Sequence, residues 1–162
     1  MLENCKSAQE RWGGVSSLID NWLQERQEML VCFCALGEIN DFNSDNSVHR
    51  EKLKNFCEIL VDYTSAGHFE IFDQLIKEGQ ELKDNSGLEV ADNLFQTIDA
   101  TTEIILDFND KYLETDDLKT LANDLSGLGE SLASRLGAED KMIEVLHTNH
   151  REKVLSNDLS DD

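Results

Sequence analysis

The stretch that decides the fold class is CKSAQERWGGVSSLIDNWLQERQEMLVCFCALG, residues 5–37. Its apolar side chains recur every three or four residues, which places them along one side of an α-helix. They are Ala8, Trp12, Val15, Leu18, Ile19, Trp22, Leu23, Met29, Leu30 and Phe33. The pattern predicts a long amphipathic helix that ends near Gly37, where glycine can adopt a left-handed conformation. Gly13 and Gly14 inside it predict a bend or a close contact with a neighbouring backbone.

A second helical pattern follows a predicted loop over Glu38–Ser47, which is rich in Asn, Asp and Ser. Its first apolar set is Leu53, Phe56, Ile59, Leu60, Tyr63 and Ala66, and its second set is Phe69, Phe72 and Ile76. At about 100° per residue the two sets centre on nearly opposite sides of the helix. We therefore predict a helix that is buried all round, with a kink or a change of packing partner at Ser65–His68.

Two further helices are indicated by their start signals and apolar stripes. Ser86-Gly87-Leu88-Glu89 has the Ser-x-x-Glu form of a capping box, and Thr115-Asp116-Asp117 has the composition of an N-cap and first turn. Proline is absent from the whole sequence, so nothing interrupts long helices. The prediction is an all-α, up-and-down bundle of four long helices, some kinked or broken. One domain is expected over residues 1–155, followed by a short mobile acidic tail over 156–162.

The charge balance limits the classes of partner. The 162 residues include 14 basic and 34 acidic side chains, a net charge of −20 at pH 7. Nucleic acid and anionic membrane surfaces are disfavoured as direct partners because they would be repelled, and a basic protein partner is favoured. Alternatively, the acidity serves solubility alone. The N-terminus does not resemble a secretion signal, and no apolar run approaches a membrane span, so a cytoplasmic location is predicted.

No motif for catalysis or metal binding is complete. The four cysteines, Cys5, Cys32, Cys34 and Cys57, lack paired Cys-x-x-Cys spacing and are interpreted as core or boundary thiols without disulfides. Glu144-Val145-Leu146-His147 is half of a di-metal carboxylate motif, and His150 adds no third ligand. We find no phosphate loop and no nucleophile elbow. The sequence therefore predicts no enzyme, no metal and no other cofactor.

Asp62, Ser65 and His68 recur every three positions through an otherwise apolar helix. Three interpretations remain open. They form a buried hydrogen-bond network, they line a polar binding concavity, or the carboxylate acts as a general base beside the histidine. The three differ in how exposed the side chains are.

Three blocks of sequence carry a family resemblance. The first is ERWGGV at residues 10–15 leading to LIDNWLQER at 18–26, the second is FCEILVDYTSAGHFEI at 56–71, and the third is EDKMIEVLH at 139–147. In this order and spacing, over roughly residues 1–150, they resemble the Rsd/AlgQ family, with the first helix closer to the AlgQ branch. The resemblance implies a bacterial anti-sigma factor. Such a protein binds the C-terminal promoter-recognition domain of the primary sigma factor and limits its use by RNA polymerase, in stationary-phase and virulence regulation.

The resemblance also implies a partner-binding surface, or its support, on the first two helices. Its residues are Asp20, Trp22, Glu25, Arg26, Asp62, Tyr63, Ser65, His68 and Glu70. Trp22 and Tyr63 would be anchors, and the acidic residues would pair with arginines of the sigma factor. The alternative for Trp22 is a core residue. The second functional hypothesis is an adaptor that docks a phosphotransferase carrier or an alarmone enzyme, which would then be a second cytosolic partner.

Overall fold

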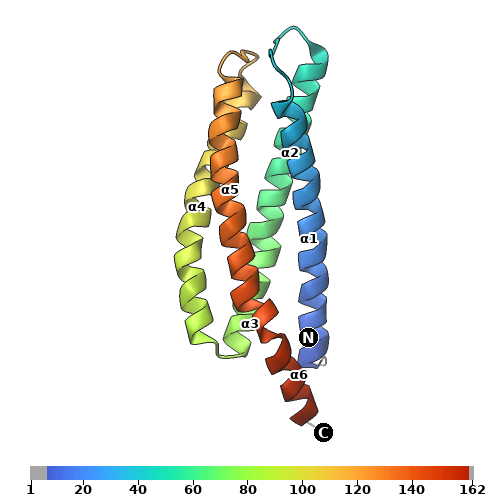
Figure 1. Cartoon of the computed structure of the whole chain (residues 1–162), viewed down its shortest axis with the longest axis vertical. Coiled ribbons are helices and arrows are strands. Elements are labelled where there is room, and N and C mark those ends of the chain that lie inside the picture. Colours follow the sequence, from blue (N-terminus) through green and yellow to red (C-terminus); the bar gives the residue numbers. More distant parts are fainter. Residues whose placement is uncertain (1–6, 161–162) are drawn as a thin grey trace.

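A computed structural model describes residues 7–160, and for residues 156–160 it gives only the course of the helix. Four long helical arms run alternately up and down (Figure 1). They are α1 (Ala8–Gly37), the arm formed by α2 (Ser47–Ala66), η2 (Gly67–Ile71) and α3 (Phe72–Glu81), then α4 (Asn85–Glu114) and α5 (Leu121–Leu146). The short turn η3 (Thr148–His150) leads to α6 (Arg151–Ser160). The predicted all-α bundle is confirmed, and the described residues contain no strand.

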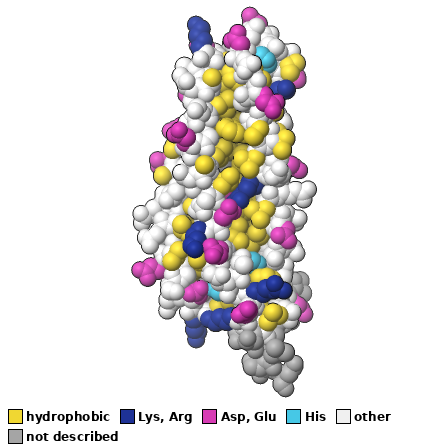
Figure 2. All heavy atoms as spheres, viewed as in Figure 1, with side chains coloured by type: hydrophobic (Ala, Val, Ile, Leu, Met, Phe, Trp, Pro, Cys, Tyr) yellow, Lys and Arg dark blue, Asp and Glu magenta, His cyan; other side chains and the backbone are white. Residues whose placement is uncertain are grey.

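The arms pack as two pairs. The main partner of α1 is α2 and that of α4 is α5, while contacts of α2 with α4 and of α3 with both α4 and α5 join the pairs. On the face seen in Figure 2, hydrophobic side chains form a band along the long axis, with charged side chains at its edges and a few near its middle. Inside the bundle, the buried apolar residues of all four arms form one core cluster. No helix in the described part of the chain combines the length and apolar character needed to cross a membrane.

The first helix has the predicted end but not the predicted conformation there. Ser7 caps its start, because the hydroxyl oxygen accepts a hydrogen bond from the Glu10 amide at 3.1 Å, and Cys5 lies outside the described residues. No described glycine has a positive φ, so the left-handed conformation predicted for Gly37 is wrong. A Cβ added to Gly13 or Gly14 would meet no atom within 4 Å beyond its own stretch of helix, so of the two alternatives predicted for this pair the close contact with a neighbouring backbone is wrong.

Two of the predicted helix starts are wrong. Asp84, not Ser86, caps α4, since its carboxylate accepts from the Gly87 amide at 2.9 Å. The fourth long helix begins at Leu121, because the side chains of Thr115 and Asp117 accept hydrogen bonds from nearby amides and hold this segment in a turn. The predicted loop over Glu38–Ser47 is confirmed up to Asn46, whose side chain caps α2.

The crossover predicted at Ser65–His68 is a π-helical turn, η2. The Phe72 amide donates to the Gly67 carbonyl five residues earlier, which defines the wider turn. On either side of it, the rings of Tyr63 and Phe72 both contact Trp22, with centroids 4.8 Å apart in a stacked pair and 5.7 Å apart edge to face. The prediction that this arm is buried all round is wrong, because η2 exposes His68 and Phe69.

The end of the chain is partly helical. The backbone of α6 reaches Ser160, and residues 161–162 lie outside the described residues. The mobility expected for 156–162 and the division into a domain of 1–155 and a tail stay predictions.

Candidate functional site

Four exposed carboxylates lie together where α1 meets the α2–η2 arm. Glu25 and Glu28 come from α1, Asp62 from α2 and Glu70 from η2, and we call this group the acidic surface. Partial burial raises the pKa of Glu25, and the negative charges of Glu70, Glu28 and Asp62 raise it further. Like charges held this close repel one another, so a basic partner that neutralises them would be bound favourably.

Phe69 is an exposed aromatic residue at the acidic surface. Its side chain is 73% exposed, it immediately precedes Glu70, and it contacts the His68 ring edge to face at 4.9 Å. Exposed aromatic rings surrounded by charged residues commonly serve as interface anchors. The sequence pattern assigned Phe69 to the core. The signal that identifies it is the change of helical phase, which moves Phe69 away from the apolar side of α2.

Trp22 and Tyr63 are not part of the surface. Their side chains are 2% and 1% exposed, and the Trp22 indole N–H donates to the Tyr63 carbonyl at 3.1 Å. The expectation that they act as anchors is therefore corrected, and the alternative of a core residue holds for Trp22. Trp22 and Tyr63 instead join α1 to α2, because their rings stack with centroids 4.8 Å apart.

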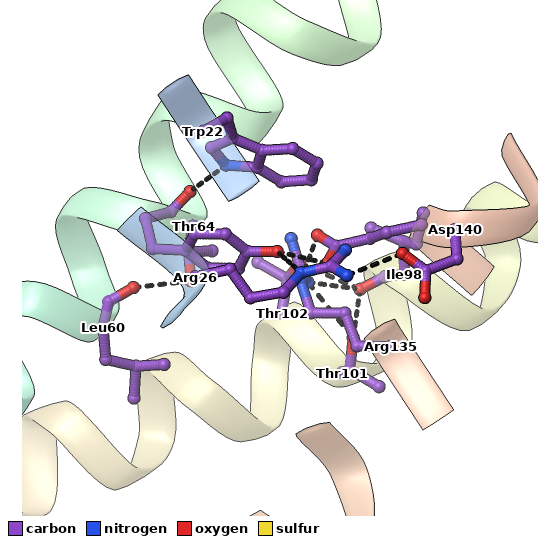
Figure 3. A network of polar contacts seen from close by, with 11 residues as sticks. Trp22, Arg26, Leu60, Thr64, Ile98, Thr101, Thr102, Arg135 and Asp140 are labelled. Carbon is purple, nitrogen blue, oxygen red and sulfur yellow. Dashed lines mark hydrogen bonds and ion pairs between the residues drawn. The ribbon is translucent and has the colours of Figure 1, made fainter. Parts of the chain in front are cut away.

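A buried polar network joins α1 to α5, and Figure 3 shows its side chains. Arg26 donates from Nε to the Tyr63 hydroxyl at 3.0 Å, and that hydroxyl donates to Glu139 Oε1 at 2.5 Å. The Arg26 guanidinium also pairs with Glu139 at 3.3 Å and with Asp140 at 2.6 Å. The predicted site residues Arg26 and Tyr63 thus connect the helices of the acidic surface to α5.

Arg135 extends the network to α4. Its Nε donates to Glu139 Oε2 at 3.2 Å, and its NH1 donates to the Ile98 carbonyl at 3.1 Å and to the hydroxyls of Thr101 and Thr102 at 3.1 and 2.7 Å. All four arms therefore contribute to one network that joins the two helix pairs. The sequence patterns did not identify Arg135 or Glu139 as site residues. The available signal was an Arg–Glu pair four residues apart on the apolar side of α5.

The protonation states in this network follow from burial and pairing. Burial raises the pKa of Glu139, although Arg135, Tyr63 and Arg26 oppose the shift. Burial and the neighbouring Glu139 raise the pKa of Tyr63, which keeps its hydroxyl protonated as a donor. Burial alone would lower the pKa of Arg26, but Tyr63, Asp140 and Glu139 more than offset this effect. The network positions side chains from all four arms, and Asp140 is its exposed member.

The remaining predicted residues lie at or near the surface. Asp20 is exposed on α1 about 140° around the helix from Glu25, and Ser65 is half-buried on α2. Asp62 and His68 are both exposed. The hypothesis that these two residues belong to a buried network is therefore wrong, and a role in binding stays a prediction.

Because both side chains are exposed, Asp62→Ala and His68→Ala should each change the free energy of unfolding by no more than about 0.5 kcal/mol. Thermal melts of the two variants and the unsubstituted chain test this expectation. A loss of stability larger than about 1 kcal/mol in Asp62→Ala would restore the buried-network hypothesis.

The residues of the half metal motif lie apart in the structure, and the described cysteines are free. Glu144 pairs with Lys141 at the surface at 3.1 Å, whereas His147 bonds to Glu78 in the interior, so the half motif does not converge on one point. Among residues 7–155 no group of three or more His, Cys, Asp or Glu side chains is arranged to hold a metal ion. Cys32, Cys34 and Cys57 are free thiols, and Cys5 lies outside the described residues.

Comparison with known proteins identifies the family. Residues 1–147 match the family model described as regulator of RNA polymerase sigma(70) subunit, Rsd/AlgQ. The chain belongs to the Rsd/AlgQ family. Within the Rsd/AlgQ match lie the acidic surface, Phe69 and the buried network, whereas His150 and α6 follow it in the sequence. The resemblance carried by the three sequence blocks is thereby confirmed.

Several relatives have the name "Regulator of sigma D". The protein of Yersinia enterocolitica is 34% identical over 149 residues, which cover 89% of this chain and 89% of the relative. The protein of an Enterobacter species is 36% identical over 155 residues, 93% of this chain and 92% of the relative. The protein of Shigella dysenteriae is 36% identical over 148 residues, 88% of this chain and 92% of the relative. The similarity to these Rsd/AlgQ proteins therefore extends over nearly the whole chain.

Proposed function

We propose that this Rsd/AlgQ protein is an anti-sigma factor. It binds the C-terminal promoter-recognition domain of the primary sigma factor in the cytoplasm and limits the use of that factor by RNA polymerase. The observation that carries the proposal is the acidic surface with its exposed aromatic residue, Phe69. The relatives named "Regulator of sigma D" support the choice of partner.

Competition for the sigma domain has a physical basis. A helix-turn-helix domain that docks on DNA phosphates presents basic side chains, and the same side chains can pair with carboxylates of a protein. Glu25, Asp62 and Glu70 would supply this charge, and Phe69 would supply the apolar contact at its edge. The protein acts as a binding partner and not as an enzyme, since blocking the DNA-binding surface needs no chemical step.

Neutralising the acidic surface should slow association with the sigma domain. The triple variant Glu25→Gln, Asp62→Asn, Glu70→Gln is expected to lower the association rate about tenfold at low salt, with a smaller change in the dissociation rate. The difference should shrink at high salt, because screening shortens the range of the field to roughly 8 Å at physiological ionic strength. Stopped-flow or surface-based kinetics with the isolated C-terminal sigma domain measure both rates.

A charge-matched control separates the site from the net charge. The triple variant Asp99→Asn, Glu103→Gln, Asp107→Asn removes three exposed carboxylates from α4 and should leave the association rate nearly unchanged. Equal effects of the two triple variants would mean that only net charge matters. If the unsubstituted chain does not bind the sigma domain but does bind a phosphotransferase carrier or an alarmone enzyme, the adaptor hypothesis replaces the proposal.

A further inference from the structure

A second cluster of titratable side chains lies at the base of the bundle, where the end of α3 meets η3. Its members are Glu78 of α3, Asp84 in the α3–α4 turn, and the two histidines His147 and His150. Glu78, His147 and His150 are buried, and Asp84 is partly buried. The proposed anti-sigma function uses none of them.

The carboxylates bind three ring nitrogens. Glu78 lies 3.0 Å from His147 Nδ1 and 3.3 Å from His150 Nδ1. On the other side of the His150 ring, Nε2 lies 2.7 Å from Asp84 Oδ2. His150 is therefore held between two carboxylates, with one at each nitrogen.

The hydrogen-bond partners of the ring nitrogens indicate which nitrogens carry a proton. An ionised carboxylate only accepts hydrogen bonds, so a ring nitrogen that faces one must be a donor. The hydrogen bonds from His150 and from the Gly87 amide lower the pKa of Asp84, which keeps it ionised. A carboxylate oxygen thus faces each nitrogen of His150, an arrangement that suits an imidazolium because an imidazolium donates at both nitrogens. His147 differs, because its Nε2 is buried without a partner in the described structure, which favours the neutral form with the proton on Nδ1.

We propose that His150 is a proton-dependent latch that holds α6 on the bundle. His150 ends η3 and directly precedes α6, and it lies beyond the residues that match the family model. The start of α6 is also fixed by Lys153, whose ammonium donates to the Leu82 carbonyl at 2.6 Å, and by the buried side chain of Val154. Of these three contacts, only the His150 contact involves an imidazole, the kind of side chain whose charge generally changes between about pH 5 and pH 8.

The direction of the pH dependence follows from the two carboxylates. When His150 loses a proton, one of its nitrogens faces a carboxylate with a lone pair, and the attraction becomes repulsion. The latch therefore weakens as the pH rises. At low pH, Asp84 sets a second limit. Folding lowers the pKa of its carboxyl, so Asp84 stabilises the fold above its unfolded pKa, which is near 3.9. This contribution is lost as the pH falls through the pKa of the folded state.

Other charges surround the latch without forming a bond to His150. Those on the neighbouring elements are Arg11 of α1, Glu81 of α3, and Arg151, Glu152 and Lys153 of α6. Arg11 and Glu81 pair with each other at 3.6 Å, and Lys153 is engaged with the Leu82 carbonyl. His150 is thus the side chain that bridges Glu78 and Asp84.

Hydrogen exchange of the full chain tests the latch. After correction for intrinsic exchange rates, the protection of the α6 amides should fall about tenfold between roughly pH 6 and pH 9, while the middle of α4 keeps its protection. In His150→Gln, which cannot carry the charge, α6 should have low protection at both pH values. His68→Gln, which changes an exposed histidine, should retain the pH dependence of the unsubstituted chain.

Two results would overturn the proposal. One is α6 protection that does not change with pH in the unsubstituted chain, and the other is a pH dependence that persists in His150→Gln. If His150→Gln does not fold, Asp84→Asn takes its place, since asparagine also caps helices but removes one of the two charges. Asp84→Asn should move the loss of α6 protection to lower pH, and no movement would also overturn the latch.

Discussion

Replacing Glu139 by alanine should lower the free energy of unfolding by about 3–5 kcal/mol. The Glu139 side chain is completely buried and accepts hydrogen bonds from Arg26, Tyr63 and Arg135. Its removal leaves the buried Arg135 guanidinium without its counter-charge and deprives Arg26 of one of its two carboxylates. The cost is large because an unpaired charge in the interior cannot regain its hydration without opening the contact between the helix pairs.

Urea denaturation of Glu139→Ala and the unsubstituted chain measures this loss. The matched control is Glu144→Ala on the same helix, where an exposed carboxylate pairs with Lys141 and where a change of at most about 0.5 kcal/mol is expected. A loss of less than about 1 kcal/mol in Glu139→Ala would show that the network contributes little beyond packing.

Gly67→Ala should have the second largest effect, a destabilisation of about 1–3 kcal/mol. An added Cβ would lie 2.8 Å from Cζ2 of Trp22, closer than real side chains approach, and 3.3 Å from Cε2, which is also a tight contact. The indole cannot easily move away, because Tyr63 stacks on it and Phe72 contacts it edge to face. The alanine therefore forces either the ring or the π-helical turn out of place.

Gly127→Ala provides a control of opposite sign. Gly127 lies inside α5 and is exposed, and an added Cβ there would meet nothing within 4 Å. Because alanine is about 1 kcal/mol more favourable than glycine within a helix, this variant should be stabilised. Thermal melts of both variants give the comparison, and stabilisation by both substitutions would show that the Trp22 contact adapts to the added methyl group.

The arms of the bundle could be predicted because the periodicity of apolar residues is a local property of the sequence. Helix starts were harder, as the α3–α4 turn shows. Ser86 and Asp84 are two residues apart and both are good capping residues. The choice of Asp84 coincides with its contact to His150, which is 66 residues away and is not visible in a local pattern.

The sequence identified residues of the candidate site, but it did not show which of them face the surface and which face the interior. Asp62 and Tyr63 are adjacent in the sequence, yet the first is exposed and the second is buried, because neighbouring helical residues point about 100° apart. The family resemblance identifies both residues, but it cannot distinguish a residue that contacts the partner from one that supports the contacting residues. Arg135 and Glu139 have the spacing of an ordinary surface ion pair. They are buried because α4 covers Arg135, while side chains of α1 and α2 cover Glu139.

The π-helical turn makes the length of the second arm as important as its composition. Tyr63 and Phe72 contact the same indole although nine positions separate them. In an uninterrupted α-helix nine residues make about two and a half turns, which would place the two rings on opposite sides. The wide turn absorbs the surplus residue. Losing that one residue would return the arm to a regular α-helix and keep Phe72 on the side of Trp22, because eight steps of about 100° leave the two rings only about 80° apart. We therefore expect an aligned relative without the π-helical turn to lack one residue in this segment and to keep both aromatic contacts with Trp22.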